Sequence, residues 1–360
     1  MAIASPAPAA GPTSSRRGVW LRLAVSVALI AWILWRTPFP EILSAFRSAD
    51  LRFVLLALAL NPFGYLASVR RWRLLIRAQG ADAPLSFLLR SFLAGVFFNN
   101  LLPSTIGGDT VRALDTARTG VGRARAIAIV FVDRFVGLLA LMLFAVLGLL
   151  VSGRLTARVP ALGAWVIGGA AVLGVLAALL FLPSRMAVPG RLAALRAFQG
   201  QGSVLARAFG WSLLLQTLVV LNAYLLARAL HVPIPFPHFF LIVPLALFVM
   251  MLPVSINAIG VRENVWAFFF AVFGVAAAKG IAVAWLDYGL VLLQALIGGI
   301  IYARRSRVAI AGDPPPVLPL DRGEGSCAET ESLSGSQRPD VTISFSLPRL
   351  RGRVGERVTL

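Results

Sequence analysis

The chain has 360 residues, of which 58% are hydrophobic, and its formal net charge is +19. A mean hydropathy of +0.83 excludes a soluble globular protein of this length, so the sequence predicts an all-α polytopic membrane protein. The positive charge does not indicate nucleic acid as a partner, because the arginines flank apolar segments, where they hold helix ends at an anionic membrane surface.

Residues 1–18 are polar and lack the apolar core of a signal peptide, so we expect a disordered cytoplasmic N-terminus. Segments near the length of about 20 residues that a bilayer requires then follow. We predict six full spans, at about 19–35, 53–69, 124–152, 159–182, 208–230 and 280–302. The transmembrane domain is expected to cover residues 19–305. Residues 306–360, rich in Pro, Gly, Ser and charge, are expected to be a disordered tail.

Three other apolar segments, 85–102, 239–252 and 262–275, do not look like ordinary spans. The last two have about 14 residues each, which gives about 21 Å of helix against a hydrocarbon core of about 30 Å. We interpret the three segments as parts of two broken or re-entrant helical elements. If residues 85–102 re-enter, all basic loops and both termini lie in the cytoplasm, as the positive-inside rule requires. Full crossings, giving about eight spans by hydropathy, are the alternative.

Two similar motifs occupy the ends of these segments: LPSTIGGDTVR begins at Leu102 and LPVSINAIGVR begins at Leu252. In both motifs an arginine follows the proline by nine positions. A Gly-Val pair after each motif precedes an aspartate by 13 positions, at Asp133 and Asp287. With three crossings between the motifs, residues 53–140 and 208–302 are predicted to be halves of an inverted repeat, an arrangement typical of transporters. A chance likeness between two helix ends is the alternative.

Each motif combines a helix interruption with an arginine. Glycines and amide side chains suit a non-helical backbone inside the membrane, and a helix N-terminus beside an arginine suits a phosphate group. The candidate residues for headgroup binding and translocation in and next to the two motifs are Asn99, Pro103, Gly107, Gly108, Asp109, Arg112, Pro253, Asn257, Gly260, Arg262 and Glu263.

Charged residues inside predicted spans are further candidates. Asp133 and Arg134 lie about ten residues within a span, where an uncompensated charge costs at least about 2.5–3.5 kcal/mol. We expect Asp133 to pair with Arg71 or Arg112, and Arg134 to meet a lipid phosphate. Asp287 is the counterpart of Asp133 in the second half.

Structural roles for these residues remain open as alternatives. Asp109 could serve as a helix cap, and Arg262 and Glu263 could neutralise each other at a loop. Asp133 could form an intramembrane salt bridge that has no role in transport.

Signatures of soluble enzymes are missing from the sequence, which has no Walker-type loop, no HExxH and no Gly-x-Ser-x-Gly. His231 and His238 have no acidic or cysteine companions, so no metal and no cofactor is expected. The single cysteine, Cys327, excludes an intrachain disulfide. The expected partners are membrane lipids, with a lipid-synthesising enzyme as a further candidate. Neither nucleic acid nor a particular oligomeric state is indicated.

The chain resembles the lysylphosphatidylglycerol synthase transmembrane region, also described as the flippase-like or UPF0104 family, over about residues 20–305. The residues that carry the resemblance are Arg71-Trp72, Asn99, Leu102-Pro103, Gly107-Gly108-Asp109, Arg112, Asp133-Arg134, Leu252-Pro253, Gly260, Arg262 and Glu263. It implies a multi-pass bacterial inner-membrane protein related to the flippase half of the multiple peptide resistance factor, which moves aminoacylated phosphatidylglycerol between leaflets. The soluble aminoacyl-transferase domain of the fused enzymes is absent, so that activity is not implied.

We therefore expect a lipid flippase-like transporter that moves a phospholipid, or a related anionic or zwitterionic lipid, between leaflets. One alternative is an integral-membrane lipid or polyprenyl-phosphate transferase that uses Asp109 or Asp133 as a base. The other is a non-catalytic subunit of a membrane lipid pathway. The family departs from this chain at two places, because a glutamate often stands at the position of Asp133 and the second motif is often richer in glycine than Asn257-Ala258.

Overall fold

The computed structural model of the chain describes residues 39–101, 106–153, 159, 161–181, 197–252 and 254–309. Within these ranges the chain forms ten α-helices and no β-strand. The predicted all-α fold of a polytopic membrane protein is thereby confirmed. The predicted first span, the N-terminal segment 1–18 and the part of the predicted tail after residue 309 lie outside the described residues.

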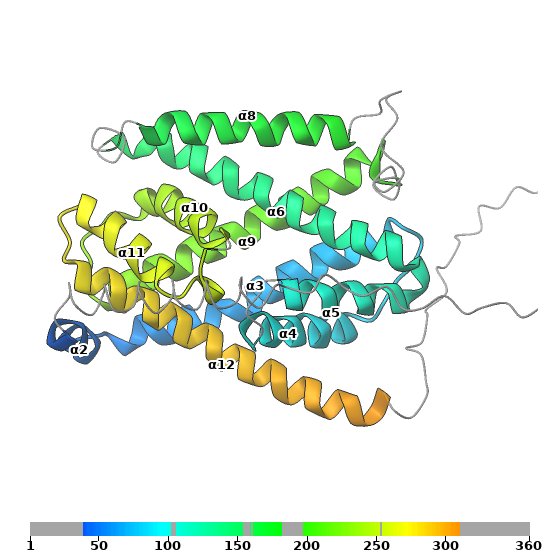
Figure 1. Ribbon diagram of the computed structural model, residues 1–360, viewed down its shortest axis with the longest axis horizontal. Helices are drawn as coiled ribbons and strands as arrows, with labels where there is room; N and C mark the ends of the chain where they lie inside the picture. Colours follow the sequence, from blue (N-terminus) through cyan, green and yellow to red (C-terminus); the bar gives the residue numbers. More distant parts are fainter. Residues whose placement is uncertain are drawn as a thin grey trace, which may run out of the picture. The chain divides into compact units, whose positions relative to one another are not determined.

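In the described part of the chain, five long helices are apolar enough to cross a membrane (Figure 1). They are α3 (Leu51–Arg77), α6 (Arg123–Val151), α8 (Ala161–Phe181), α9 (Gly202–Ala229) and α12 (Ala277–Ala309). Each coincides with a predicted span, but α3 continues beyond the expected end at residue 69 to Arg77. Cationic side chains are favourable near a helix C-terminus, and three arginines of this segment also have carboxylate partners: Arg71 pairs with Asp133, and both Arg73 and Arg77 pair with Asp82. Arg70, Arg71, Arg73 and Arg77 therefore lie within α3.

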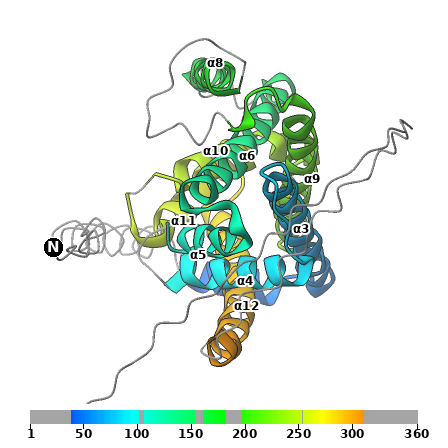
Figure 2. The same cartoon turned by 90° about the vertical axis from the view of Figure 1, so that its right-hand side faces the viewer.

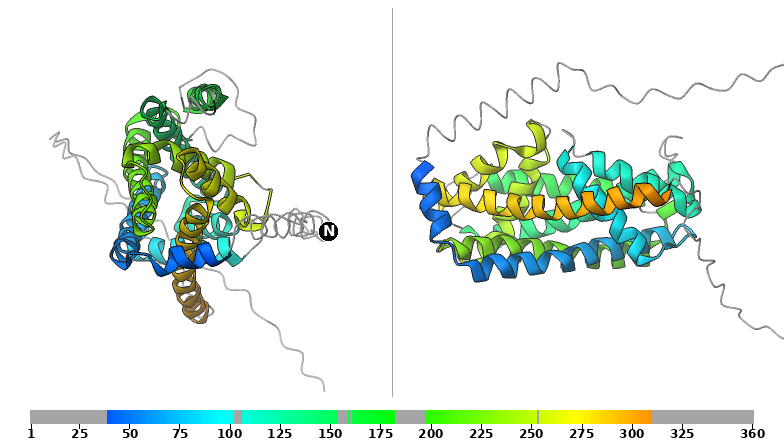
Figure 3. Two further views of the ribbon diagram at one scale, coloured as in Figure 1. Left: turned by 90° about the vertical axis from the view of Figure 1, so that its left-hand side faces the viewer. Right: turned by 90° about the horizontal axis from the view of Figure 1, so that it is seen from below.

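Two pairs of short helices occupy the positions of the predicted broken helices. The first pair is α4 (Leu85–Leu101) with α5 (Ile106–Thr116), and the second is α10 (Phe239–Met250) with α11 (Val261–Val272). The members of each pair pack against each other, so each motif lies in a helical hairpin. The hairpins lie toward opposite ends of the long helices in Figures 1 and 3. Entry from opposite faces of a membrane stays a prediction.

Helices of the two predicted halves, 53–140 and 208–302, pack against each other. Helices α3 and α9 pack side by side, as Figure 2 shows. The first arm of each hairpin packs on the long helix of the other half, α4 on α12 and α10 on α6. The second arm packs on the long helix of its own half, α5 on α6 and α11 on α12. A two-fold relation between the halves would produce this packing, in which each first arm contacts the long helix of the other half. The inverted repeat stays an inference from this packing.

The remaining elements lie around this arrangement. Helix α8 packs on α6 and is largely exposed, with Trp165 at 78% exposure, as expected for a lipid-facing helix. Helix α2 (Phe39–Arg47) packs near the start of α12 and lies across the direction of α3 (Figure 3). The short turns are Ala117–Val121, Phe236–His238 and Ile256–Ala258.

The buried apolar side chains form two clusters that hold the hairpins against the long helices. One cluster joins α9, α10, α11 and α12 around Leu226, Phe239 and Phe270, which are fully buried. The other joins α3, α6 and the start of α9 around Trp72 and Ile129. The polar residues described next lie among these clusters, so the fold fixes their positions.

Candidate functional site

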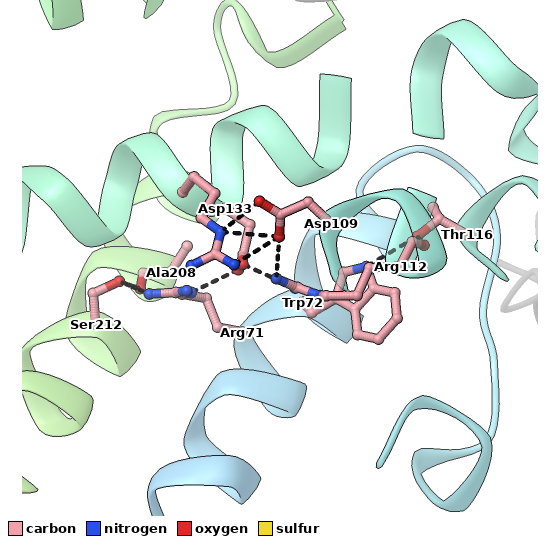
Figure 4. Close-up of polar contacts among 9 residues, drawn as sticks. Arg71, Trp72, Asp109, Arg112, Thr116, Asp133, Ala208 and Ser212 are labelled. Carbon is pink, nitrogen blue, oxygen red and sulfur yellow. Dashed lines mark hydrogen bonds and ion pairs between the residues drawn. The ribbon is translucent and has the colours of Figure 1, made fainter. Parts of the chain in front are cut away.

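Asp133 of α6 is fully buried and is held by arginines from two other helices. Arg71 Nε of α3 donates to Oδ1 at 2.7 Å, and an Nη of Arg112 of α5 donates to Oδ2 at 2.9 Å. The sequence predicted one or the other arginine as the partner, and the structure brings both together (Figure 4). Two cations on one carboxylate remove the penalty of a lone intramembrane charge.

Arg71 also ties a third long helix to this cluster. Its Nη1 donates to Ser212 Oγ of α9 at 2.7 Å, and that hydroxyl donates to the carbonyl of Ala208 at 3.0 Å. Gly137 of α6 lies against the guanidinium, because a Cβ placed there would be 3.3 Å from Arg71 Nη1. Helices α3, α6 and α9 therefore meet at one buried arginine.

Arg112 is fixed by aromatic rings as well as by Asp133. Its guanidinium carbon lies 4.5 Å from the ring centre of Trp72 and 5.5 Å from that of Phe92, distances at which a cation is attracted to a ring face. Trp72 Nε1 in turn donates to Thr116 Oγ1 at 3.1 Å. Among the described residues Arg112 Nε has no hydrogen-bond partner. The arginine thus keeps one donor that an anion can use.

Arg134 pairs with Asp109 on the edge of the cluster. Arg134 Nε and an Nη lie 3.1 and 2.7 Å from Asp109 Oδ1, and a guanidinium nitrogen of Arg112 lies 4.0 Å from the same oxygen. The side chain of Arg134 is 49% exposed. Asp109 lies in the first turn of α5, where its carboxylate binds an arginine.

Three arginines and two aspartates form this cluster, so one positive charge is in excess. Its members are Arg71, Arg112, Arg134, Asp109 and Asp133. An excess positive charge in a low-dielectric site favours an anionic ligand.

Glycine allows the arms of the first hairpin to approach closely. A Cβ at Gly108 of α5 would overlap the backbone of Gly95 of α4 and the side chain of Asn99. Asn99 Oδ1 also accepts the backbone N–H of Gly108 at 2.8 Å. Gly107 is half-buried beside them, and the predicted residue Pro103 lies outside the described residues.

The second motif uses its charged residues differently. The backbone of Gly260 has a φ of 83°, which favours glycine, and its N–H donates to Glu263 Oε2 at 2.7 Å at the start of α11. Arg262 does not pair with Glu263 in the described part of the chain, contrary to the alternative of mutual neutralisation. Instead, its guanidinium carbon lies 4.3 Å from the ring centre of Tyr288. Glu263 therefore has a structural part as a helix cap.

The interrupted ends of the two hairpins contact each other. Asn257 Nδ2, in the turn before α11, lies 3.1 Å from Asn100 Oδ1 at the end of α4 and 3.1 Å from the hydroxyl of Tyr288. Asn257 has a φ of 50°, a left-handed conformation that asparagine tolerates. Pro253, the other predicted residue of this turn, lies outside the described residues. The two motifs thus meet although they are far apart in the sequence.

A cavity of about 390 Å³ extends between the hairpins and the long helices. It is lined by the three arginines of the cluster and also by Asp287, Asn222, Trp266 and Gln294. Arg262 is not among its lining residues. Asp287 accepts a hydrogen bond from Asn222 Nδ2 at 3.4 Å. The cavity therefore connects the cationic cluster with the acidic residue of the second half.

Several residues of this site were not among the candidates. They are Trp72, Ser212, Asn222, Tyr288, Trp266 and Gln294. Ser212 and Asn222 lie in a largely apolar span, and polar residues inside a span are a usable signal of inward-facing positions. Tyr288 and Trp266 gave no such signal, because Trp and Tyr also occur in membrane helices as anchors at the membrane interfaces.

Comparison with known proteins identifies relatives that cover most of the chain. Residues 19–298 match the family described as the Lysylphosphatidylglycerol synthase TM region. A UPF0104 membrane protein of Pyrococcus horikoshii is 24% identical over 333 residues, which cover 81% of this chain and 98% of that protein. The match includes both hairpins and all the long helices up to residue 298.

Proposed function

The chain belongs to the lysylphosphatidylglycerol synthase TM region family, and from this premise we propose that it is a lipid flippase-like transporter. It moves a phospholipid, or a related anionic or zwitterionic lipid, between the leaflets of a bacterial inner membrane. Both termini face the cytoplasm, in accordance with the distribution of basic loops.

The observation that carries this proposal is the cavity at the junction of the two hairpins. It is lined by Arg71, Arg112 and Arg134 within a bundle whose long helices are apolar enough to cross a membrane. Non-helical backbone and buried charge are costly inside a bilayer and are usually retained where a polar substrate passes. A lipid headgroup is such a substrate, and its acyl chains can remain in the surrounding lipid.

The phosphate of the headgroup binds through the excess positive charge of the cluster. Arg134 is half exposed and can exchange the carboxylate of Asp109 for a phosphate. Arg112 offers its Nε, which has no hydrogen-bond partner in the described part of the chain. Arginine suits this role because its planar guanidinium can donate two parallel hydrogen bonds to phosphate oxygens. Asp133 is a positioning residue that holds Arg71 and Arg112 in place.

Movement between leaflets follows from the relation between the halves. In transporters built from inverted repeats, one repeat rocks against the other around a fixed central site. Here the contact between Asn100 and Asn257 joins the interrupted ends of the hairpins. Opening one hairpin at a time gives the headgroup access from one face and then from the other.

Arg134→Gln tests the proposal with limited risk to folding. The purified protein is placed in phosphatidylcholine and phosphatidylglycerol vesicles, and the movement of acyl-labelled phosphatidylglycerol between leaflets is measured. We expect the rate to fall by about tenfold to a hundredfold, which corresponds to the loss of a charged hydrogen bond worth about 1.5–3 kcal/mol.

Arg207→Gln is the matched control, because Arg207 is exposed at the start of α9 and does not line the cavity. It is expected to retain the rate of the unmodified protein. Equal rates in Arg134→Gln and the control would refute the phosphate-binding role. Formation of a new lipid species in the vesicles, detected by mass spectrometry, would favour the transferase alternative instead.

A further inference from the structure

Asp287 differs from Asp109 and Asp133 in having no cationic partner among the described residues, and from Glu263 in capping no helix. Asp133 and Asp109 are held by arginines, and Glu263 accepts a backbone N–H. Asp287 accepts the weak hydrogen bond from Asn222, and in the described ranges no arginine or lysine lies within ion-pair distance of it. It is half-buried in a membrane-crossing helix and lines the cavity.

The surroundings of Asp287 are polar and can hold water. Trp266 Nε1, Gln294 Nε2 and Asn222 Oδ1 are buried atoms without a hydrogen-bond partner among the described residues. All three residues line the same cavity as Asp287. A water molecule needs about 30 Å³ and two to four polar partners, so this cavity has room for several molecules. Water can therefore reach the carboxyl group.

The groups that face Asp287 leave its charge uncompensated at close range. Tyr65 of α3 donates a hydrogen bond to Gln294, and the charge of Asp287 acts on the Tyr65 hydroxyl. Arg262 of α11 acts on Asp287 electrostatically from beyond ion-pair distance. Tyr288 of α12 holds Arg262 against its ring. Helices α2 and α4 also pack on α12 but add no charged residue to the cavity lining, and α9 contributes the neutral amide of Asn222.

We propose that Asp287 is a proton-binding site that couples the proposed lipid transport to a proton gradient. An ionised carboxylate inside a membrane needs a compensating positive charge, and here a proton from water in the cavity can supply it. The proton adds to a carboxylate oxygen and forms an O–H bond, and release to water on the other face breaks that bond. No other bond changes, and one proton crosses with each lipid.

Arg262 is placed to drive the release. It occupies the same position in the second motif as Arg112 in the first, where the arginine contacts the equivalent aspartate at 2.9 Å. If the second hairpin closes in the same way, the guanidinium replaces the proton on Asp287. Protonation and closure then alternate, and each lipid movement requires one cycle.

The experiment uses the full chain in vesicles of phosphatidylcholine and phosphatidylglycerol, with acyl-labelled phosphatidylglycerol as the probe. Potassium and valinomycin hold the membrane potential at zero while a gradient of one pH unit is imposed. With one proton per lipid, the ratio of probe between leaflets should shift by about tenfold. Asp287→Asn should show no shift, whereas Asp287→Glu should keep it. Asp50→Asn is the matched control, because Asp50 caps α3 outside the cavity and asparagine is an equally good cap, so it should respond fully.

The outcomes separate this proposal from the proposed function. If the unmodified protein moves lipid without any gradient effect, or Asp287→Asn keeps the shift, the proton site is overturned and the transport function stands. A shift produced by a sodium gradient in place of a pH gradient also overturns it. Absence of lipid movement at every gradient overturns the transport function. If Asp287→Asn fails to fold, the unmodified protein is tested with the pH indicator pyranine trapped inside the vesicles. The proposal requires that one proton enters the vesicle with each lipid moved, and lipid movement without proton entry overturns it.

Discussion

The two halves of the chain carry arginine and aspartate residues at equivalent positions but use them differently. In the first half, a guanidinium nitrogen of Arg112 lies 2.9 Å from Asp133. In the second half, Arg262 lies over the ring of Tyr288 and leaves Asp287 without an ion pair among the described residues. The predicted halves therefore share the type and spacing of these residues, while the contacts between the residues differ.

The neighbouring long helices also give the two aspartates different partners. Helix α3 contributes a second cation, Arg71, to Asp133, whereas α9 contributes the neutral amide of Asn222 to Asp287. The first half thereby gains a fixed cluster of charges, and the second keeps a carboxyl group that can change its partner. In the proposed coupled transport, rigid binding and reversible charge are separate requirements, and each half would supply one of them.

Asp133→Asn should produce the largest difference between the halves. It leaves Arg71 and Arg112 buried without a full negative charge, and breaking a buried pair in this way costs about 3–5 kcal/mol. The expected loss of stability is measured as the thermal unfolding midpoint of the purified protein in detergent. The matched change Asp287→Asn breaks no ion pair among the described residues, so its loss of stability should be much smaller. Equal losses in the two variants would contradict the asymmetry.

The sequence predicted those parts of the fold that depend on local patterns. Apolar length located the long helices, and the short segments around Leu102 and Leu252 indicated the hairpins. The cost of an intramembrane charge also indicated that Asp133 needs an arginine. These inferences depend on the free energy of placing a segment or a charge in the membrane, which can be judged from the segment alone.

Partners that depend on the rotation and packing of other helices could not be predicted in this way. Arg262 and Glu263 are adjacent in sequence and were considered a neutralising pair, but consecutive residues on a helix do not face each other. Glu263 turns back to the start of α11, and Arg262 meets the ring of Tyr288. That Asn222 rather than a cation reaches Asp287 follows from the packing of α9 near α12, which no local pattern encodes.

Gly108→Ala tests whether the close approach of α4 and α5 in the first hairpin keeps Arg112 in contact with Asp133. The added methyl group would overlap the backbone of Gly95, and such overpacking costs about 1–3 kcal/mol. Because Gly108 lies one turn before Arg112, we also expect the arginine to shift from Asp133 and lipid movement to slow. Thermal unfolding and the lipid assay measure the two effects.

Gly163→Ala in α8 is the control for this change. A Cβ there would meet nothing within 4 Å, and alanine is favoured over glycine in a helix by up to about 1 kcal/mol. The control should therefore be unchanged or slightly stabilised. If Gly108→Ala behaves like the control, the close approach has no role in positioning Arg112.

Asn222→Arg should make the second half resemble the first, because it would give Asp287 the kind of partner that Asp133 has in Arg71. A permanent cation on the carboxylate leaves no place for a proton. The roughly tenfold shift of labelled lipid caused by one pH unit, equivalent to about 1.4 kcal/mol, should disappear. Asn222→Gln keeps an amide and should retain the shift. A full response in Asn222→Arg would show that proton coupling does not involve Asp287.

The smallest expected effect concerns the links that join each long helix to its hairpin. Asp82, between α3 and α4, accepts hydrogen bonds from Arg73 and Arg77 at 2.7 Å, whereas the link between α9 and α10 is held by buried Val232 and Ile234. Burial alone would raise the pKa of Asp82, but the hydrogen bonds from both arginines lower it well below its usual range. The ion pairs therefore stabilise the fold fully above the unfolded-state pKa of about 3.9, and this contribution is lost as the pH falls toward the lower folded-state pKa.

Because both arginines are partly exposed, the contribution is expected to be about 1 kcal/mol or less. Hydrogen exchange measured from pH 6 down to pH 3, after correction for the intrinsic rates, should show the amides around Asp82 losing protection while those around Val232 do not. Asp82→Asn removes the carboxylate that titrates, so in this variant the protection near residue 82 should be lower at pH 6 and nearly independent of pH. If the two links lose protection in parallel, or if the variant keeps the acid dependence, then the ion pairs do not distinguish the first half from the second at this position.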